Sequence, residues 1–242
     1  MSDIIVNAGC MLFFAKDITH DLKKDVLACT LYTQLAATKQ YSRFNETKAW
    51  EERHLLAMNR FGWMISASET FSHSAQSGVP ASLWTWIEHT LPSFMPTNAI
   101  AEAQACARQI YVANPGQRGF ALFTCQVAAA CGSSTEGSAV APDMAQRPEA
   151  KTKVVMQLGF VDSTAQLSLV TLCFTRRGPF TSGFLFEPIN GDDIVGNLEL
   201  TFRALRLQGV VYSQFRNPID EKLQGRRDAL MATLVGVNHD HQ

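Results

Sequence analysis

The side chains that could do chemistry are a few histidines, cysteines and one glutamate, spread over the 242 residues. Glu69 and His73 share the apolar parity of the strand-like segment WMISASETFSHS. A carboxylate that orients an imidazole beside an apolar wall is the usual construction of a general base. Alternatively, both side chains are simply exposed to solvent near the end of the strand. His54 lies on the apolar stripe of a helix-like segment, either as a buried structural histidine or as a base.

A thiol-dependent hydrolase would pair a cysteine with a histidine. The candidate nucleophiles are Cys125 and Cys173, with His54 or His73 as the base. The six cysteines include no C-x-x-C pair and sit among apolar and small residues, which is typical of reduced, buried thiols. The sequence therefore favours free thiols. A disulfide between Cys125 and Cys131, the nearest pair, remains open.

Motifs with a known mechanism are missing. The chain has no G-x-x-x-x-G-K-[ST], no G-x-G-x-x-G, no H-E-x-x-H and no G-x-S-x-G. The acidic turn at 190–193 lacks the spacing of a calcium loop. The tail NHDH, residues 238–241, could hold a transition metal only adventitiously. We therefore expect no metal, no cofactor and no small-molecule ligand.

Aromatic residues concentrate in the segment LWTW and in residues 180–186, and the segment PSFMP follows the first of these. Trp84 and Trp86 cannot both face the core from a single helix, so we expect one ring to emerge. Together with Phe94 it would form an anchor for a partner protein or a membrane surface. The alternative is that tertiary packing buries both rings.

The balanced charge argues against a partner that is held mainly by long-range electrostatic attraction. Twenty-one basic and 22 acidic residues leave a net charge of −1, so no field gathers nucleic acid or an anionic membrane. The weak self-repulsion favours association. The opening MSDIIVNAGCMLFF lacks the basic region of an export signal. We interpret residues 4–14 as a first strand or buried arm and expect a cytoplasmic protein at synthesis, with non-classical export open.

Hydrophobic periodicity predicts the helices. A hairpin of two helices spans residues 17–39 and 45–61, and further helices cover 80–91 and 97–113. The segment GFALFTCQVAAAC is interpreted as a strand, although its alanines leave a helix open. Residues 132–150 contain almost no side chains whose burial could offset the entropy cost of ordering the segment. This composition predicts a long flexible loop.

Alternating patterns predict the strands. One strand covers 63–74, a hairpin pairs 153–160 with 167–174, and a short strand lies at 184–186. A long strand spans 197–215 with a bulge near Ala204, and a last helix runs from 217 to 236. Together they predict one α+β domain over 1–242, with a mainly antiparallel sheet covered by helices, an N-terminal helical hairpin and a C-terminal closing helix.

These patterns favour a non-catalytic protein that acts through its surface, by self-assembly, partner binding or an effector-like role. The missing motifs, the aromatic segments and the long loop support this hypothesis. The first alternative is the thiol- or histidine-dependent hydrolase. The second is a membrane-active, toxin-like protein, which rests only on a fold analogy. We expect self-association or a protein partner, membrane contact as an open case, and no nucleic acid.

Overall fold

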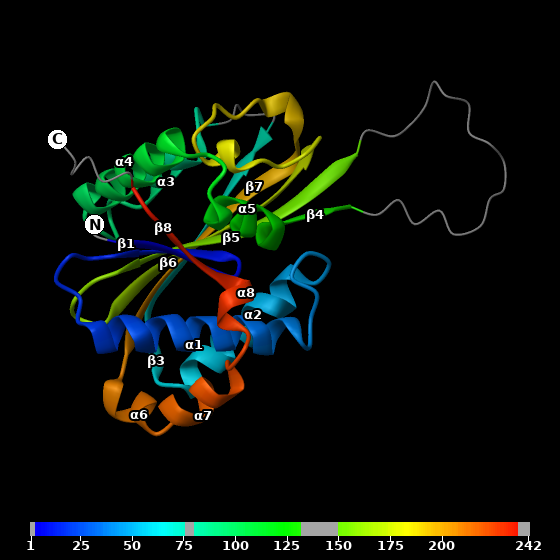
Figure 1. Cartoon of the computed structure of the whole chain (residues 1–242). Helices are drawn as coiled ribbons and strands as arrows, with labels where there is room; N and C mark the ends of the chain where they lie inside the picture. The colour runs from blue at the N-terminus through cyan, green and yellow to red at the C-terminus, as the bar shows by residue number, and fades with distance from the viewer. Residues whose placement is uncertain (1–2, 76–79, 132–149, 237–242) are drawn as a thin grey trace, which may run out of the picture.

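The computed structural model describes residues 3–75, 80–131 and 150–236. Within these residues the chain is an α+β protein whose helices cover both faces of a mixed eight-stranded sheet (Figure 1). The α+β class predicted from the sequence is therefore confirmed. The helices are α1 (His20–Thr38), α2 (Thr47–Arg60), α3 (Leu83–Thr90), α4 (Thr97–Ala113), α5 (Arg118–Val127), α6 (Gly209–Ser213), α7 (Arg216–Lys222) and α8 (Arg227–Leu230).

The sheet is mixed because one of its pairings is parallel. The strands are β1 (Asp3–Asn7), β2 (Cys10–Phe14), β3 (Trp63–Ser74), β4 (Ala128–Ala130), β5 (Lys151–Val161), β6 (Gln166–Arg177), β7 (Ile194–Leu207) and β8 (Met231–Leu234). Their order is β3-β7-β6-β5-β2-β1-β8, and β4 pairs with the first half of β5. Strand β2 runs parallel to β5, whereas the other pairings are antiparallel.

Alternating side chains of the sheet enter two apolar cores. In β7, Leu198, Leu200 and Phe202 face the core under α3, α4 and α5. Leu205 and Leu207 face the other core, under α1, α2, α6 and α7. Strand β7 therefore changes its buried side because the covering helices change. The bulge expected near Ala204 lies on the neighbouring strand, where β3 carries an extra residue between Ile65 and Ala67.

The N-terminal segment forms a strand pair followed by two packed helices. The predicted first strand is divided by a tight turn into β1 and β2, with Ala8 in the left-handed region at φ 52°. Helix α1 starts after Thr19, whose side chain accepts from the Leu22 amide, rather than at Asp17. Helix α2 ends before Gly62, which takes φ 90° as expected of a C-terminal glycine. The helical hairpin is thus preceded by two strands of the sheet.

Residues 119–131 are helical over most of their length, which corrects the prediction of a strand. Phe120, Phe123 and Val127 are all buried on the sheet side of α5, at a spacing of three and four residues. That spacing is the helical one. Only the three residues of β4 are extended. The short strand predicted at 184–186 is instead part of a 3₁₀ turn over Ser182–Leu185.

The C-terminal region differs from the predicted long strand and closing helix. Strand β7 stops at Leu207, and the short helix α6 begins at Gly209. The last helix is interrupted after Lys222, and Gly225 takes φ 73°, which an L-residue rarely adopts. The chain then forms α8 and β8, which pairs with β1. The predicted loop lies almost entirely in residues 132–149, outside the described residues.

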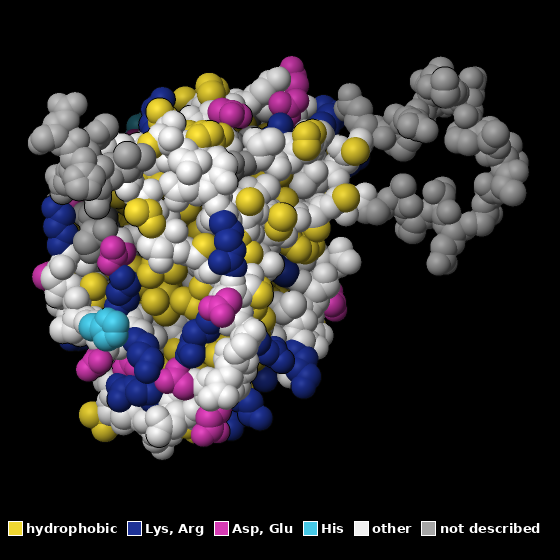
Figure 2. All heavy atoms as spheres, in the orientation of Figure 1, with side chains coloured by type: hydrophobic (Ala, Val, Ile, Leu, Met, Phe, Trp, Pro, Cys, Tyr) yellow, Lys and Arg dark blue, Asp and Glu magenta, His cyan; other side chains and the backbone are white. Residues whose placement is uncertain are grey.

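The surface seen in Figure 2 mixes charges of both signs with exposed apolar side chains. Basic and acidic groups lie next to one another over α1, α7 and α8, in the lower half of that face. This mixture agrees with the net charge of −1. Any strongly charged site must therefore be a local feature.

Candidate functional site

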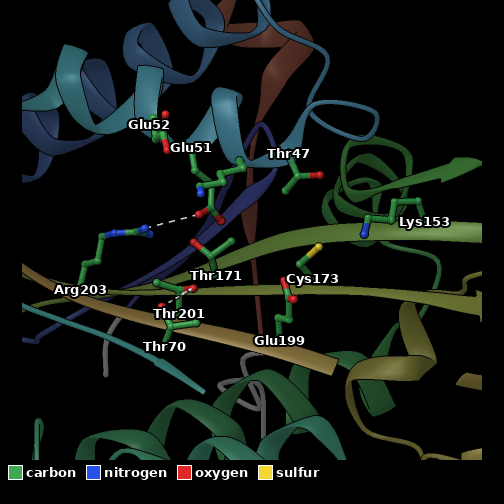
Figure 3. Close-up of a pocket in the computed structure, with 11 residues that line it drawn as sticks. Thr47, Glu51, Glu52, Thr70, Lys153, Thr171, Cys173, Glu199, Thr201 and Arg203 are labelled. Carbon is green, nitrogen blue, oxygen red and sulfur yellow. Dashed lines mark hydrogen bonds and ion pairs between the residues drawn. The ribbon is translucent and has the colours of Figure 1, made fainter. Parts of the chain in front are cut away.

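A polar cavity of about 350 Å³ lies between the first half of α2 and the face of the sheet beneath it. Strands β3, β5, β6 and β7 supply its floor, and α2 supplies its roof (Figure 3). The volume lies in the ordinary range of ligand sites, about 300–1,000 Å³. The lining residues are Thr47, Lys48, Glu51, Glu52, Thr70, Lys153, Thr171, Cys173, Glu199, Thr201 and Arg203.

Polar residues reach the cavity along a row that crosses neighbouring strands. Thr70, Thr201, Thr171 and Gln157 stand opposite one another in the registers of β3, β7, β6 and β5. The Thr70 and Thr201 hydroxyls are 3.4 Å apart, and the Gln157 amide donates to Thr171 over 3.3 Å. Because side chains directly opposite in a sheet point to the same face, this row places hydroxyl groups on the cavity floor.

An ion pair crosses the cavity from roof to floor. Arg203 of β7 donates to Glu51 of α2 over 3.4 Å, and both side chains are largely buried, at 14% and 16% exposure. Burial nevertheless raises the pKa of Glu51, and the nearby Glu199 adds to the rise, while Arg203 and Arg43 oppose it. Glu51 therefore keeps its proton to a higher pH than an exposed glutamate does.

Cys173 lies on the floor between groups of opposite charge. Glu199 of β7 stands directly opposite it in the register, and the Lys153 side chain of β5 hydrogen-bonds its thiol. Figure 3 shows Cys173 between Lys153 and Glu199. Burial raises the pKa of the Cys173 thiol, and Lys153 only partly opposes this effect. The thiol is therefore held in its protonated, weakly nucleophilic form.

His54 is buried behind the cavity, one turn beyond Glu51 on α2. Its ring stacks obliquely on Trp50 at 5.2 Å, and its Nδ1 lies 3.5 Å from the Gln157 amide nitrogen. Burial lowers the pKa of His54 to about 3, and the Arg43 and Arg203 charges add to the shift. The imidazole is therefore neutral at physiological pH, and its Nε2 has no hydrogen-bond partner among the described residues.

The structure separates most of the residues that the sequence proposed as catalytic partners. Glu69 and His73 face the opposite side of the sheet from Cys173, because β3 turns Thr70, not its neighbours, toward the cavity. Cys125 is exposed on α5, which packs against β1 and β8 at the far edge of the sheet. His54 and Cys173 lie on the same face of the sheet. Neither of them is among the causes that shift the pKa of the other.

The aromatic segment does not provide an exposed tryptophan. Trp84 and Trp86 are 0% and 8% exposed, so the expectation that one ring emerges is wrong. Helix α3 has neighbours on several sides: the sheet below it, α4, and the turn Ser182–Leu185. Trp84 packs edge-on against Phe13, and the partly buried Phe94 packs against Phe202. The alternative interpretation, in which tertiary packing buries both rings, describes the structure.

Sequence reasoning found His54 and Cys173 but missed the charged residues around the cavity. Glu51, Lys153, Glu199 and Arg203 are each single charges within ordinary amphipathic elements. The one available signal was the alternation in β7, where Glu199, Thr201 and Arg203 occupy successive positions on one face. Such alternation of polar residues is typical of a solvent-exposed strand face. This face lines a cavity only because α2 lies over it.

The described residues contain neither a metal-binding cluster nor a membrane-spanning helix. No group of three or more His, Cys, Asp or Glu side chains is placed to hold a metal ion in the described ranges. None of the helices within those ranges combines the length and apolar character that a bilayer crossing requires.

Comparison with known proteins adds no further constraint. No protein-family model matches the chain, and no curated protein matches it significantly.

Proposed function

We propose that the chain is a non-catalytic binding protein and that the cavity under α2 binds a small zwitterionic molecule, such as an amino acid. The observation that carries this proposal is the pair of opposite charges, Lys153 and Glu199, that flank Cys173 beside the hydroxyls of Thr171 and Thr201. This proposal keeps the expected non-catalytic class but departs from the expectation that no small molecule is bound.

The protonation states support binding rather than catalysis. A thiol hydrolase needs a thiolate beside a basic imidazole. Burial raises the pKa of Cys173, which keeps the thiol protonated, and lowers the pKa of His54 to about 3, which makes its neutral imidazole too weak a base to take the thiol proton. The arrangement thus lacks a nucleophile and a base that act together.

The charge pattern favours a zwitterion over an anion or a cation. Three basic and three acidic side chains line the cavity, so their formal charges cancel. Glu51 and Arg203 neutralise each other. Lys153 and Glu199 form no ion pair with one another among the described residues. Glu199 can accept from an ammonium group while Lys153 donates to a carboxylate, and the threonine hydroxyls can bind the polar remainder.

Glu199→Gln should weaken the binding of such a ligand by about tenfold or more, because a hydrogen bond to a charged group contributes about 1.5–3 kcal/mol. The probes are glycine, serine and glutamine, titrated into the full chain by calorimetry. Lys153→Met should produce a similar loss for the same ligand by removing the carboxylate partner.

Glu88→Gln is the matched control, since Glu88 is half-buried on α3 at the other face of the sheet. This variant should bind as the wild type does. The proposal fails if none of the probes binds saturably, or if Glu199→Gln binds them with unchanged affinity.

Self-assembly is a second candidate function, favoured by the edge strand β3. This 12-residue strand is the last in the described sheet order, and it exposes Met64 and Ile65 by 56% and 44%. A long edge strand with apolar side chains is a template on which a strand of a second copy can pair. The partner in this candidate function is therefore another molecule of the same chain.

Light scattering should give the wild type a mass above that of one chain, 26.7 kDa. Ile65→Lys should lower that mass, because a charge on the edge opposes strand pairing. Val112→Lys changes a side chain that is 73% exposed on α4, away from the edge, and should leave the mass unchanged. A wild type that is monomeric at high concentration would rule out self-assembly.

A further inference from the structure

A second concave site lies between α1, α2 and α7, and its charges are all of one sign. We call it the basic recess; it encloses about 280 Å³. No aspartate or glutamate is among its lining residues, which all belong to the described part of the chain. Four cationic side chains surround an apolar floor: Lys39, Arg53, Lys222 and Arg226 around Tyr32, Leu35, Ala36 and Leu223, with Gln40 beside them.

The four cations lack the acidic partners that neighbouring basic residues have. Lys24 and Arg227 both pair with Asp220, and Arg216 pairs with Asp25. By contrast, none of the four side chains of the basic recess forms an ion pair within the described residues. The Nε of Arg53 is in addition buried, with no hydrogen-bond partner in the part of the chain that the structure describes.

Helix dipoles explain only two of these positions. Lys39 caps the C-terminus of α1, and Lys222 lies in the last turn of α7, where a cation is favourable. Arg53 lies in the middle of α2, and Arg226 follows α7. Like charges brought together around a concave surface repel one another unless an anion compensates them. In a chain whose net charge is −1, this local excess requires a specific explanation.

We propose that the basic recess binds a phosphate group carried by a larger molecule. A guanidinium offers paired N–H donors that match phosphate oxygens, and lysines add point charges around it. Arg53 and Arg226 can supply the donors, and Lys39 and Lys222 the charges. The apolar floor, with the Tyr32 ring, suits the organic part of a phosphate ester. Figure 2 shows lysine and arginine side chains gathered at the lower right, near the ends of α1 and α7.

This site is independent of the zwitterion cavity. Arg53 points from α2 toward α1 and α7, whereas Glu51 and Glu52 of the same helix line the cavity. The two sites can therefore be tested separately, and Glu199→Gln should leave phosphate binding unchanged.

Pyrophosphate is the probe for the basic recess, because it carries several charges and no organic part. Calorimetric titration into the full chain should show saturable binding that weakens as sodium chloride is added. Arg53→Gln and Lys222→Gln should each weaken it by about tenfold, the loss expected for one charge-assisted hydrogen bond. Arg206→Gln, an exposed change on β7 outside the recess, should have no effect.

A phosphate group can belong to a soluble metabolite or to a lipid headgroup, and vesicles distinguish the two. Sedimentation with phosphatidylcholine vesicles that carry a phosphoinositide, lost in Lys222→Gln, would assign a lipid headgroup. Pyrophosphate binding without sedimentation would assign a soluble phosphate. Absence of both, or binding that Arg53→Gln and Lys222→Gln leave unchanged, would overturn the proposal. Lys222 is exposed, so its variant should fold normally.

Discussion

Gly9→Ala should lower the free energy of unfolding by about 1–3 kcal/mol, the usual cost of taking a buried polar group away from its hydrogen-bond partners, which is a sizeable part of the stability of an ordinary domain. Gly9 lies in the turn between β1 and β2, and a Cβ at this position would fall on the Arg43 guanidinium. Arg43 is 7% exposed; it donates to the Gly9 carbonyl over 3.0 Å and lies over the Trp50 ring at 4.4 Å. The added methyl group must displace this buried charge from its partners.

Thermal or urea unfolding followed by circular dichroism measures the effect. Gly209→Ala is the control, because a Cβ at Gly209 meets nothing within 4 Å and the position begins helix α6. It should change stability by less than about 0.5 kcal/mol. In an Arg43→Ala background, Gly9→Ala should cost much less, since the clash has been removed. Equal costs in both backgrounds would show that Arg43 does not occupy the space beside Gly9.

The Gly9–Arg43 contact illustrates what a pattern in the sequence can and cannot predict. Local signals located most elements correctly: the periodicity of α1 and α2, the alternation in β3, and the β5–β6 hairpin. They did not show that β1 and β2 form a turn into which Arg43 inserts from 34 residues away. Such a contact depends on tertiary packing, which local periodicity does not encode.

The errors at the C-terminus have a similar cause. The apolar residues from Ile219 to Leu234 fit a helical period, so the sequence predicts one helix. Gly225 interrupts it, and the segment Met231–Leu234 gains more by pairing with the edge of β1. For residues 119–131 the error is the reverse: the sequence predicts a strand where the chain is mostly helical. The reason is that a short apolar run fits both a buried strand and a helix.

The cavity was harder to predict than the fold, because its residues come from five separate elements. Cys173 stands out in the sequence only by its residue type and His54 by its place on an apolar helix stripe, and neither signal indicates that the two share a face of the sheet. The basic recess was missed for a different reason. Lys39, Arg53, Lys222 and Arg226 each resemble an ordinary solvated charge, and only the packing of α2 and α7 against α1 brings them together.

Because of His54, the protein should become progressively less stable as the pH falls from about 6.5 toward 3. The upper limit is the pKa of a histidine in the unfolded chain. Burial lowers the pKa of His54 in the folded chain to about 3, so the unfolded chain binds this proton first. The unfolded state thus gains stability relative to the folded state throughout that window, by about 1.4 kcal/mol per pH unit. The contribution of His54 is fully present above pH 6.5.

His54→Phe should remove this slope, because a phenyl ring can stack on Trp50 without binding a proton. The measurement is the free energy of unfolding in urea at several values between pH 6.5 and 4, compared between the two proteins. Their difference should change by roughly 3 kcal/mol across that range. The raised pKa of Glu51 acts in the opposite sense, since its contribution is lost as the pH rises, but it is common to both proteins.

His20→Gln separates this effect from a general loss of histidine charge, because His20 is exposed at the start of α1. Its profile should follow that of the wild type. Parallel profiles for the wild type and His54→Phe would mean that the buried imidazole accepts a proton in the folded state. His54 would then be available as a base beside the cavity, and the main argument for a non-catalytic site would fail. The same measurement thus tests both the stability of the fold and the class of the proposed function.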